Sequence, residues 1–337
     1  MLEKADLSLL GVLANHVKTR LNGDYVFFNR NFHIEPTNIC RFSCKFCSYR
    51  RSAGDPDSWD YSLEEMLVQV KNQLHKNVTE VHIVGGAYPN RDISSTLKLI
   101  ESIRAMAPEL HIKAYSAVEL DYMFQVNNTS VKDGLAMLKK AGLNSLPGGG
   151  AEIFNPLIRN IICPEKTDAQ RWLEIHETAH NLGIPSNATM LYGHIESAGD
   201  RISHMDRLRS LQDKTGGLNC FIPLKYRRKN NPLGTTTSEV NTIDDLRMFA
   251  VSRIFMDNIR HLKAYWPMLG KDNSVLALSF GVDDLDGTID DTTKIYSMAG
   301  VKESNISMSS AQMVSLIKQS GYIPAERDSL YNILKGY

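Results

Sequence analysis

The chain has 337 residues and carries 38 basic (Lys plus Arg) and 38 acidic (Asp plus Glu) side chains, so its formal net charge is zero. This balance argues against nucleic acid or an acidic membrane surface as a partner. No apolar run reaches the roughly 18 residues of a membrane span, and the first residues lack the basic and then apolar order of a signal peptide. We therefore expect a cytoplasmic protein.

The hydrophobic pattern predicts strands and helices in alternation. Helices are expected at 7–21, 62–74, 92–106, 130–142, 167–183, 200–213, from 242 onwards and at 309–320, and strands at 25–28, 32–34, 78–84, 111–117, 143–146, 186–192, 219–224, 264–266 and 275–280. Such alternation is typical of an α/β fold whose parallel sheet closes into a (β/α) barrel of the TIM type. We expect residues 1–337 to form one domain, with residues 1–31 as an N-terminal helical flank.

Three of the five cysteines, Cys40, Cys44 and Cys47, have the spacing C-x3-C-x2-C directly after the strand expected at 32–34. Thiolates are soft ligands that suit iron-sulfur clusters or zinc. A closed zinc site needs four ligands, and no second C-x2-C pair occurs. A cubane cluster held by three cysteines leaves one iron open to a ligand. We favour the 4Fe-4S cluster and keep a non-catalytic zinc-binding protein as the alternative.

A second metal motif, H-E-x-x-H, occurs at His176, Glu177 and His180. This order is found in zinc metalloproteases. It falls on the helix expected at 167–183, which would lie outside the barrel and away from the strand ends that carry barrel active sites. No third ligand is evident nearby, so we prefer the cluster enzyme.

Chemically distinctive residues follow several expected strands, where barrel enzymes carry their sites. They are Gly85 and Gly86, Ser116 and Glu119, the segment 147–152 with its triple glycine and Glu152, Asn187, Tyr192, His194 and Glu196, and the segment 281–288. Bare glycine backbone lets a ligand approach closely. Arg159 could fork onto a carboxylate, and His194 beside Glu196 is a candidate acid or base.

The cysteine loop, with the aromatic Phe46 before its last cysteine, resembles the signature of radical S-adenosylmethionine (SAM) enzymes. Four further segments, 147–153, 172–176, 186–196 and 280–288, resemble the aminofutalosine (aminodeoxyfutalosine) synthases of the futalosine route to menaquinone. The resemblance extends to about residue 330. Two positions depart from it, because Ala87 stands where many members are acidic and Tyr88 where relatives carry histidine.

The resemblance implies the radical SAM fold, a 4Fe-4S cluster on the three cysteines and SAM as co-substrate. The implied reaction adds the 5'-deoxyadenosyl radical to 3-[(1-carboxyvinyl)oxy]benzoate, with aryl migration and decarboxylation, and forms 6-amino-6-deoxyfutalosine. The alternative is cyclic dehypoxanthinyl futalosine synthase or another radical SAM enzyme that abstracts hydrogen. The partners would be this dicarboxylate and an electron donor such as flavodoxin or ferredoxin.

The expected site has three groups of residues. The metal ligands are Cys40, Cys44 and Cys47, the catalytic residues are His194, Arg159 and Glu196, and the SAM-binding residues are Tyr49, Gly85, Gly86, Ser116, Glu119, Glu152, Asn187 and Tyr192. Arg50, Arg159 and His194 are the candidates for the two substrate carboxylates.

Overall fold

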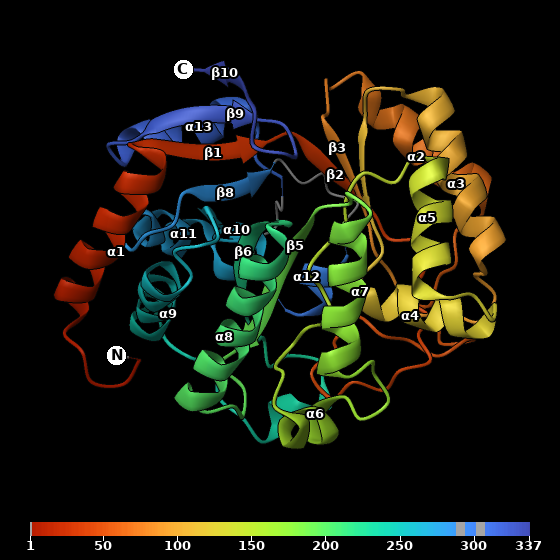
Figure 1. Ribbon diagram of the computed structural model, residues 1–337, viewed down its shortest axis with the longest axis horizontal. Helices are drawn as coiled ribbons and strands as arrows, with labels where there is room; N and C mark the ends of the chain where they lie inside the picture. Colours follow the sequence, from red (N-terminus) through yellow and green to blue (C-terminus); the bar gives the residue numbers. More distant parts are fainter. Residues whose placement is uncertain (1, 288–293, 301–306) are drawn as a thin grey trace.

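The structure is a computed structural model that describes residues 2–287, 294–300 and 307–337 (Figure 1). The helices are α1 (Leu7–Asn22), α2 (Leu63–Leu74), α3 (Ile93–Met106), α4 (Ala117–Val126), α5 (Val131–Ala141), α6 (Pro156–Ile162), α7 (Ala169–Asn181), α8 (Ala198–Thr215), α9 (Thr242–Phe255), α10 (Trp266–Leu269), α11 (Lys271–Leu278), α12 (Ile295–Met298) and α13 (Ser310–Gln319), with a 3-10 turn η1 (Pro232–Thr235). The strands are β1 (Tyr25–Asn29), β2 (Asn31–Ile34), β3 (Glu80–Ile83), β4 (His111–Ala114), β5 (Ser186–Tyr192), β6 (Leu218–Lys225), β7 (His261–Leu262), β8 (Asp284–Gly287), β9 (Ile323–Arg327) and β10 (Ile333–Gly336).

The strands pair in three mostly parallel sheets. The sheets have the orders β10-β9-β1-β8, β2-β3-β4 and β5-β6-β7, and among the strands of the described ranges only the pair of β10 with β9 is antiparallel. Single bridges join the sheets, at Lys113 with Ser145, Leu146 with Ser186, and Lys263 with Asp284. Because β1 and β2 are separated by Arg30 alone, the pairings lead from β2 around to β8 and back to β1. This is the strand arrangement of the expected α/β barrel.

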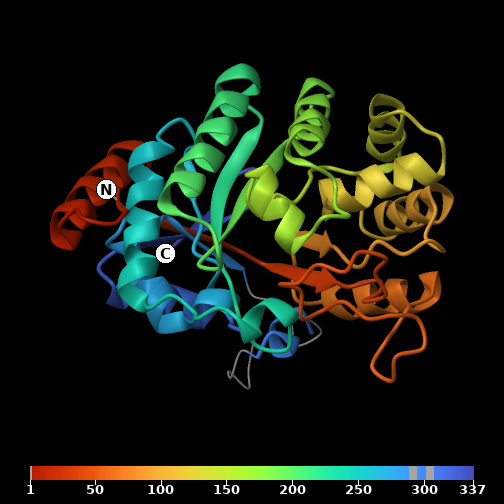
Figure 2. The same cartoon turned by 90° about the horizontal axis from the view of Figure 1, so that it is seen from below.

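Helices cover the outside of this strand series (Figures 1 and 2). Phe32 on β2, Val81 on β3 and Ile112 on β4 are fully buried. The intervening residues His33, His82 and Lys113 pair in register across the same strands. Since successive residues of a strand point to opposite faces, the apolar set packs under the helices and the polar set lines the barrel interior. A polar layer therefore lies directly beneath the loops at the carboxyl ends of these strands.

Two of the predicted strands are wrong. Residues 275–280 were expected to form a strand, but Lys271–Leu278 form α11, in which Ala277 and Leu278 are buried and Leu276 is half exposed. A short apolar run does not distinguish a buried strand from a helix. The strand expected at 264–266 lies earlier, at β7, and Trp266 begins α10. The last strand of the ring is β8, whose charged residues hid it in the sequence.

The N-terminal flank is shorter than expected. The helix α1 packs on α9, but Tyr25–Asn29 form β1, which lies inside the sheet between β8 and β9. That residues 1–337 form one domain stays a prediction. None of the helices in the described ranges is long and apolar enough to cross a bilayer.

Candidate functional site

The cysteine loop leaves the carboxyl end of β2 and is held by hydrogen bonds within itself. The amide of Cys40 donates to the carbonyl of Arg51 at 3.1 Å. The hydroxyl of Tyr49 donates to the carbonyl of Thr37 at 3.1 Å. Tyr49, a predicted SAM contact, thus braces the loop that carries the thiols, and its binding role stays a prediction.

The thiols of this loop are reduced and largely shielded from water. Cys44 is buried, and Cys40 and Cys47 are partly exposed. Burial raises the pKa of Cys44 to about 12 and also raises that of Cys47, while the nearby Lys166 lowers both. The Cys44 thiol is therefore protonated at neutral pH, and metal binding at Cys44 would displace that proton.

The donor set of the loop fits an iron-sulfur cluster. Within the described ranges, no three His, Cys, Asp or Glu side chains are placed to hold one metal ion. A cubane cluster binds each of its cysteines through a different iron, so its ligands need not converge on a single ion. Cys40, Cys44 and Cys47, carried by one short loop at the end of β2, are the residues that would hold it.

Gly85 and Gly86, which follow β3, pack directly against the cysteine loop. A Cβ atom on Gly86 would lie 2.1 Å from the carbonyl oxygen of Ile39 and 3.0 Å from the Cβ of Cys40. A Cβ atom on Gly85 would lie 2.8 Å from the carbonyl oxygen of Thr37. The nearest neighbour of both glycines is the cysteine loop itself, and their predicted role in binding SAM stays a prediction. Their absent side chains therefore set the position of the first cysteine.

Glu119 ties the end of β3 to the start of α4. Its carboxylate accepts hydrogen bonds from the amide of Gly85 at 2.9 Å and from the amide and hydroxyl of Ser116 at 2.8 and 2.6 Å. Burial raises the pKa of Glu119, although these hydrogen bonds oppose the shift. Three residues predicted for the site, Gly85, Ser116 and Glu119, are thus brought together by the fold.

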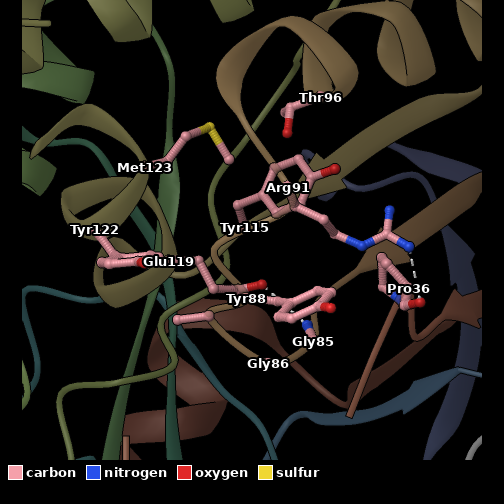
Figure 3. A pocket seen from close by; sticks show the side chains of 11 residues that line it. Pro36, Gly85, Gly86, Tyr88, Arg91, Thr96, Tyr115, Glu119, Tyr122 and Met123 are labelled. Carbon is pink, nitrogen blue, oxygen red and sulfur yellow. Dashed lines mark hydrogen bonds between the residues drawn. The ribbon is translucent and has the colours of Figure 1, made fainter. Parts of the chain in front are cut away.

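A small pocket opens beside Glu119 and Gly85 (Figure 3). It is lined by Pro36, Gly85, Gly86, Ala87, Tyr88, Arg91, Thr96, Tyr115, Glu119, Tyr122 and Met123. The guanidinium of Arg91, which lines the pocket, donates to the carbonyls of Pro36 and Tyr61 and to the carboxylate of Asp60. Arg91 thereby ties the pocket to the chain on both sides of the cysteine loop. The pocket therefore presents aromatic faces, one carboxylate and glycine backbone beside the loop.

Glu152 pairs with a lysine that the sequence interpretation did not select. The ammonium of Lys166 lies 2.6 Å from the Glu152 carboxylate, and both side chains are nearly buried. Glu152 has a positive φ of 49°, which is unusual for a residue other than glycine and is a mark of strained, often functional positions. The same ammonium lies 5.2 Å from the centre of the Phe46 ring in the cysteine loop. The pair connects Glu152 to the candidate metal site.

The triple glycine packs on β5. A Cβ atom on Gly148 would lie 2.7 Å from the carbonyl oxygen of Asn187, whereas one on Gly149 would meet nothing closer than 3.7 Å. The side chain of Asn187 is almost completely buried. Tyr192, at the far end of the same strand, donates its hydroxyl to Asp245 at 2.7 Å. The predicted SAM-binding roles of Asn187 and Tyr192 stay predictions.

His194 and Glu196 form a closed turn after β5. The Nε2 atom of His194 lies 3.2 Å from the carbonyl oxygen of Leu191, and its Nδ1 atom lies 3.1 Å from the Glu196 carboxylate. Glu196 also accepts hydrogen bonds from the amides of Gly193 and His194 and from Arg201. Burial lowers the pKa of His194 despite the adjacent carboxylate. Both side chains stabilise the turn, and their catalytic role stays a prediction.

Arg159 is occupied by backbone carbonyls. Its guanidinium donates to the carbonyl oxygens of Ala151, Ile153 and Thr167, and the side chain is buried. Arg159 thereby fixes the segment that carries Glu152. We therefore look for the cations that bind the substrate carboxylates elsewhere. The predicted catalytic role of Arg159 stays a prediction. Arg50, a further candidate, points its Nε toward the carbonyl of Cys40 at 3.5 Å.

The H-E-x-x-H motif is explained by packing. Nδ1 of His176 lies 2.7 Å and Nε2 of His180 lies 2.8 Å from the hydroxyl of Ser186 on β5. The ring of His176 stacks on that of Trp172 at 3.7 Å between centroids. Burial lowers the pKa of His176 far below its ordinary value. The two histidines join α7 to the barrel.

A buried cluster of charged and polar side chains occupies the barrel interior. It consists of His33, Glu80, His82, Lys113, Lys263 and Asp286. Lys113 lies 2.5 Å from Glu80, Lys263 lies 2.5 Å from Asp286, and the two imidazoles meet edge to face at 4.6 Å. The sequence signal was the alternation of polar residues along strands whose other face is apolar. We did not select these residues from the sequence.

Comparisons with known proteins agree with this site. The family model "Radical SAM superfamily" matches residues 34–208, and "CofH/MqnC C-terminal region" matches residues 215–336. The chain is 40% identical to the aminodeoxyfutalosine synthase of Thermus thermophilus, over 97% of this chain and 88% of that protein. It is 38% identical to the aminodeoxyfutalosine synthase of Streptomyces coelicolor, over 99% and 89%.

A differently named relative has a similar extent of match. The 5-amino-6-(D-ribitylamino)uracil--L-tyrosine 4-hydroxyphenyl transferase of Methanopyrus kandleri is 35% identical over 96% of this chain and 88% of that protein. Among solved structures, methylornithine synthase (PylB) superposes with a TM-score of 0.75 at 16% identity, over 95% of this chain and 89% of that chain. The maturase HydG from Carboxydothermus hydrogenoformans superposes with a TM-score of 0.74 at 19% identity, over 98% and 75%. The expected fold class is confirmed.

The family follows from these matches taken together with the cysteine loop. The first match covers more than half of the chain and begins at the end of β2, where the loop starts. The synthase matches span nearly the whole of both proteins. The chain therefore belongs to the radical SAM superfamily and, within it, to the aminodeoxyfutalosine synthase family, and it is an enzyme that uses a 4Fe-4S cluster and SAM.

Proposed function

We propose that this enzyme joins the adenosyl group of SAM to 3-[(1-carboxyvinyl)oxy]benzoate and thereby makes 6-amino-6-deoxyfutalosine for menaquinone biosynthesis. A new carbon-carbon bond forms between the 5'-carbon of the adenosyl group and the enol carbon, the aryl group migrates, and one carboxylate leaves as carbon dioxide. The observation that carries the proposal is the near full-length similarity to two synthases of that name. When bound and reduced, the cluster supplies the electron that splits SAM.

On this proposal, the chain first positions SAM beside the cysteine loop. Glu119 and the Gly85 backbone are fixed to each other, and Glu152 is held by Lys166. Carboxylates held in place by donors are suited to orient the amino or hydroxyl groups of a ligand. The pocket beside Glu119 adds the aromatic faces of Tyr88 and Tyr122. Pre-organised contacts of this kind keep the reacting carbon in one place.

The substrate carries two carboxylates, and the barrel interior offers donors for them. Lys113 and Lys263 each have one close acidic partner, and an ammonium group has three N–H donors. His82, which is partly exposed, adds an imidazole from the neighbouring strand. Because each lysine is already paired with an acid, recognition rests on directed hydrogen bonds and not on net positive charge. We place the substrate in this polar layer, below the cysteine loop.

The M. kandleri match supports a second candidate, a transferase that acts on the two compounds its name contains, L-tyrosine and 5-amino-6-(D-ribitylamino)uracil. The cyclase of the futalosine pathway is a further alternative, as the resemblance of the sequence to radical SAM enzymes implies. Both would also use SAM. They differ from the synthase in whether the adenosyl group ends in the product.

The test is anaerobic reconstitution with iron and sulfide, followed by reduction and parallel incubation of SAM with each substrate set. A flavodoxin or a ferredoxin is compared with dithionite as the donor. An adenosyl-substrate adduct that has lost carbon dioxide, seen by mass spectrometry and absent from Cys44→Ala, is the expected product. Free 5'-deoxyadenosine made only with tyrosine and the aminouracil would instead assign the second function, and the proposal would be withdrawn.

A further inference from the structure

The last residue of α6 and the segment that follows it clamp the cysteine loop at two points. The amide of Lys45 donates to the carbonyl oxygen of Ile162 at 2.8 Å. The amide and hydroxyl of Ser43 donate to the carboxylate of Glu165 at 3.0 and 3.1 Å. Both loop residues flank Cys44. The clamp therefore fixes the distance between this loop and Lys166, the next residue of the segment.

Lys166 brings a buried positive charge to the loop. Its ammonium lies 5.2 Å from the centre of the Phe46 ring, and Phe46 directly precedes Cys47. Only 14% of its side chain is exposed. Its ammonium is paired with the Glu152 carboxylate at 2.6 Å, an ion pair that favours the charged form of the lysine.

A fixed charge beside an iron-sulfur cluster changes the ease of its reduction. Reduction adds one electron, so a neighbouring cation stabilises the reduced state and a neighbouring anion destabilises it. The effect is strong where water is excluded and weak where it screens the charge. We propose that Lys166 raises the reduction potential of the cluster held by Cys40, Cys44 and Cys47, and that Glu152 moderates this effect.

Two exposed cations of the cysteine loop, Arg41 and Lys45, are poorer candidates for this role. Arg41 is exposed and lies 4.8 Å from the centre of the Tyr122 ring. Lys45 is exposed as well. Solvent and salt screen such charges, so their removal is expected to move the potential little. Lys45 thus provides a matched control, since it is a lysine of the same loop with a different environment.

The experiment is a redox titration of the reconstituted protein followed by electron paramagnetic resonance, with neither SAM nor substrate present. Lys166→Met is expected to have a more negative midpoint potential than the wild type, because Glu152 then lacks its partner. Lys166→Arg, which keeps the charge, is expected to stay near the wild type. Glu152→Gln is expected to shift the potential upward, and Lys45→Met to leave it nearly unchanged.

Several outcomes would overturn the proposal. An unchanged or higher potential in Lys166→Met would do so, and so would shifts of Lys166→Met and Glu152→Gln in the same direction, which would indicate a disturbed loop. If Lys166→Met takes up no cluster, the Glu152→Gln variant decides, and a midpoint potential in that variant no higher than that of the wild type would overturn the proposal. The measurement does not depend on which substrate the enzyme uses.

Discussion

Replacing Lys113 by methionine removes one partner of a buried ion pair while nearly keeping the side-chain volume. Lys113 and Glu80 lie 2.5 Å apart, with 7% and 1% of their side chains exposed. Burial alone would raise the pKa of Glu80, but Lys113, His111 and Lys263 hold it well below the usual range. In the variant, the Glu80 carboxylate is left buried with a much weaker set of positive neighbours.

Loss of one partner of a buried pair costs about 3–5 kcal/mol of unfolding free energy. A domain has only about 5–15 kcal/mol in total, so the effect is large. The sign of the pH dependence follows from Glu80. In the wild type its lowered pKa contributes stability at neutral pH that is lost as the pH falls. In Lys113→Met the burial of Glu80 is no longer offset by its close lysine and raises the pKa of this carboxyl, so the variant loses further stability as the pH rises from 5 to 8 and its deficit is larger at pH 8.

Urea unfolding of the reduced apoprotein, followed by tryptophan fluorescence, measures this difference because Trp172 and Trp266 are buried. The double variant Glu80→Gln with Lys113→Met is expected to recover much of the loss, since no unpaired charge remains. A loss below about 1 kcal/mol in Lys113→Met would refute the reasoning, because it would place the pair in the class of solvent-screened ion pairs. A double variant as unstable as the single one would also refute it.

Three further predictions follow from individual positions. Gly86→Ala is expected to lower the iron bound per chain, because its Cβ would lie 2.1 Å from the carbonyl oxygen of Ile39, whereas Gly336→Ala, with nothing within 4 Å, should bind iron as the wild type does. Burial raises the pKa of Glu35 to about 7, although hydrogen bonds from the amides of Lys294 and Ile295 oppose the shift. The free energy of unfolding of the wild type should therefore decline as the pH rises from about 4.5 through 7. A Glu35→Gln variant that kept this decline would show that Glu35 is not its cause. His176→Ala is expected to lower the urea midpoint and to leave zinc content, measured by mass spectrometry, unchanged; loss of a stoichiometric zinc would restore the metalloprotease reading.

Most helices could be predicted because their signals are local. Ser62 with Glu65 and Ser130 with Asp133 mark helix starts within a few residues, and the structure has those caps. The strand predicted at 275–280 was wrong because four consecutive apolar residues show neither the period of a helix nor that of a strand. The strand β8 was missed for the opposite reason, because Asp284 and Asp286 are typical of loops in a sequence. In the structure they are buried beside Arg327 and Lys263, which pair with them. Thr288, the last residue of the segment 281–288 that was expected to follow the strand at 275–280, lies outside the described residues.

The sequence by itself determined the chemistry of the centre, because three cysteines spaced within eight residues can meet one cluster whatever the rest of the chain does. It also determined the alternation that leads to a parallel barrel. Only the tertiary structure decided that Lys166 lies against Phe46, that Glu119 holds Gly85, and that Lys113 pairs with Glu80. These contacts join residues that are far apart in the chain and depend on how neighbouring parallel strands are aligned. That alignment is set by packing across the whole barrel and leaves no local pattern in the sequence.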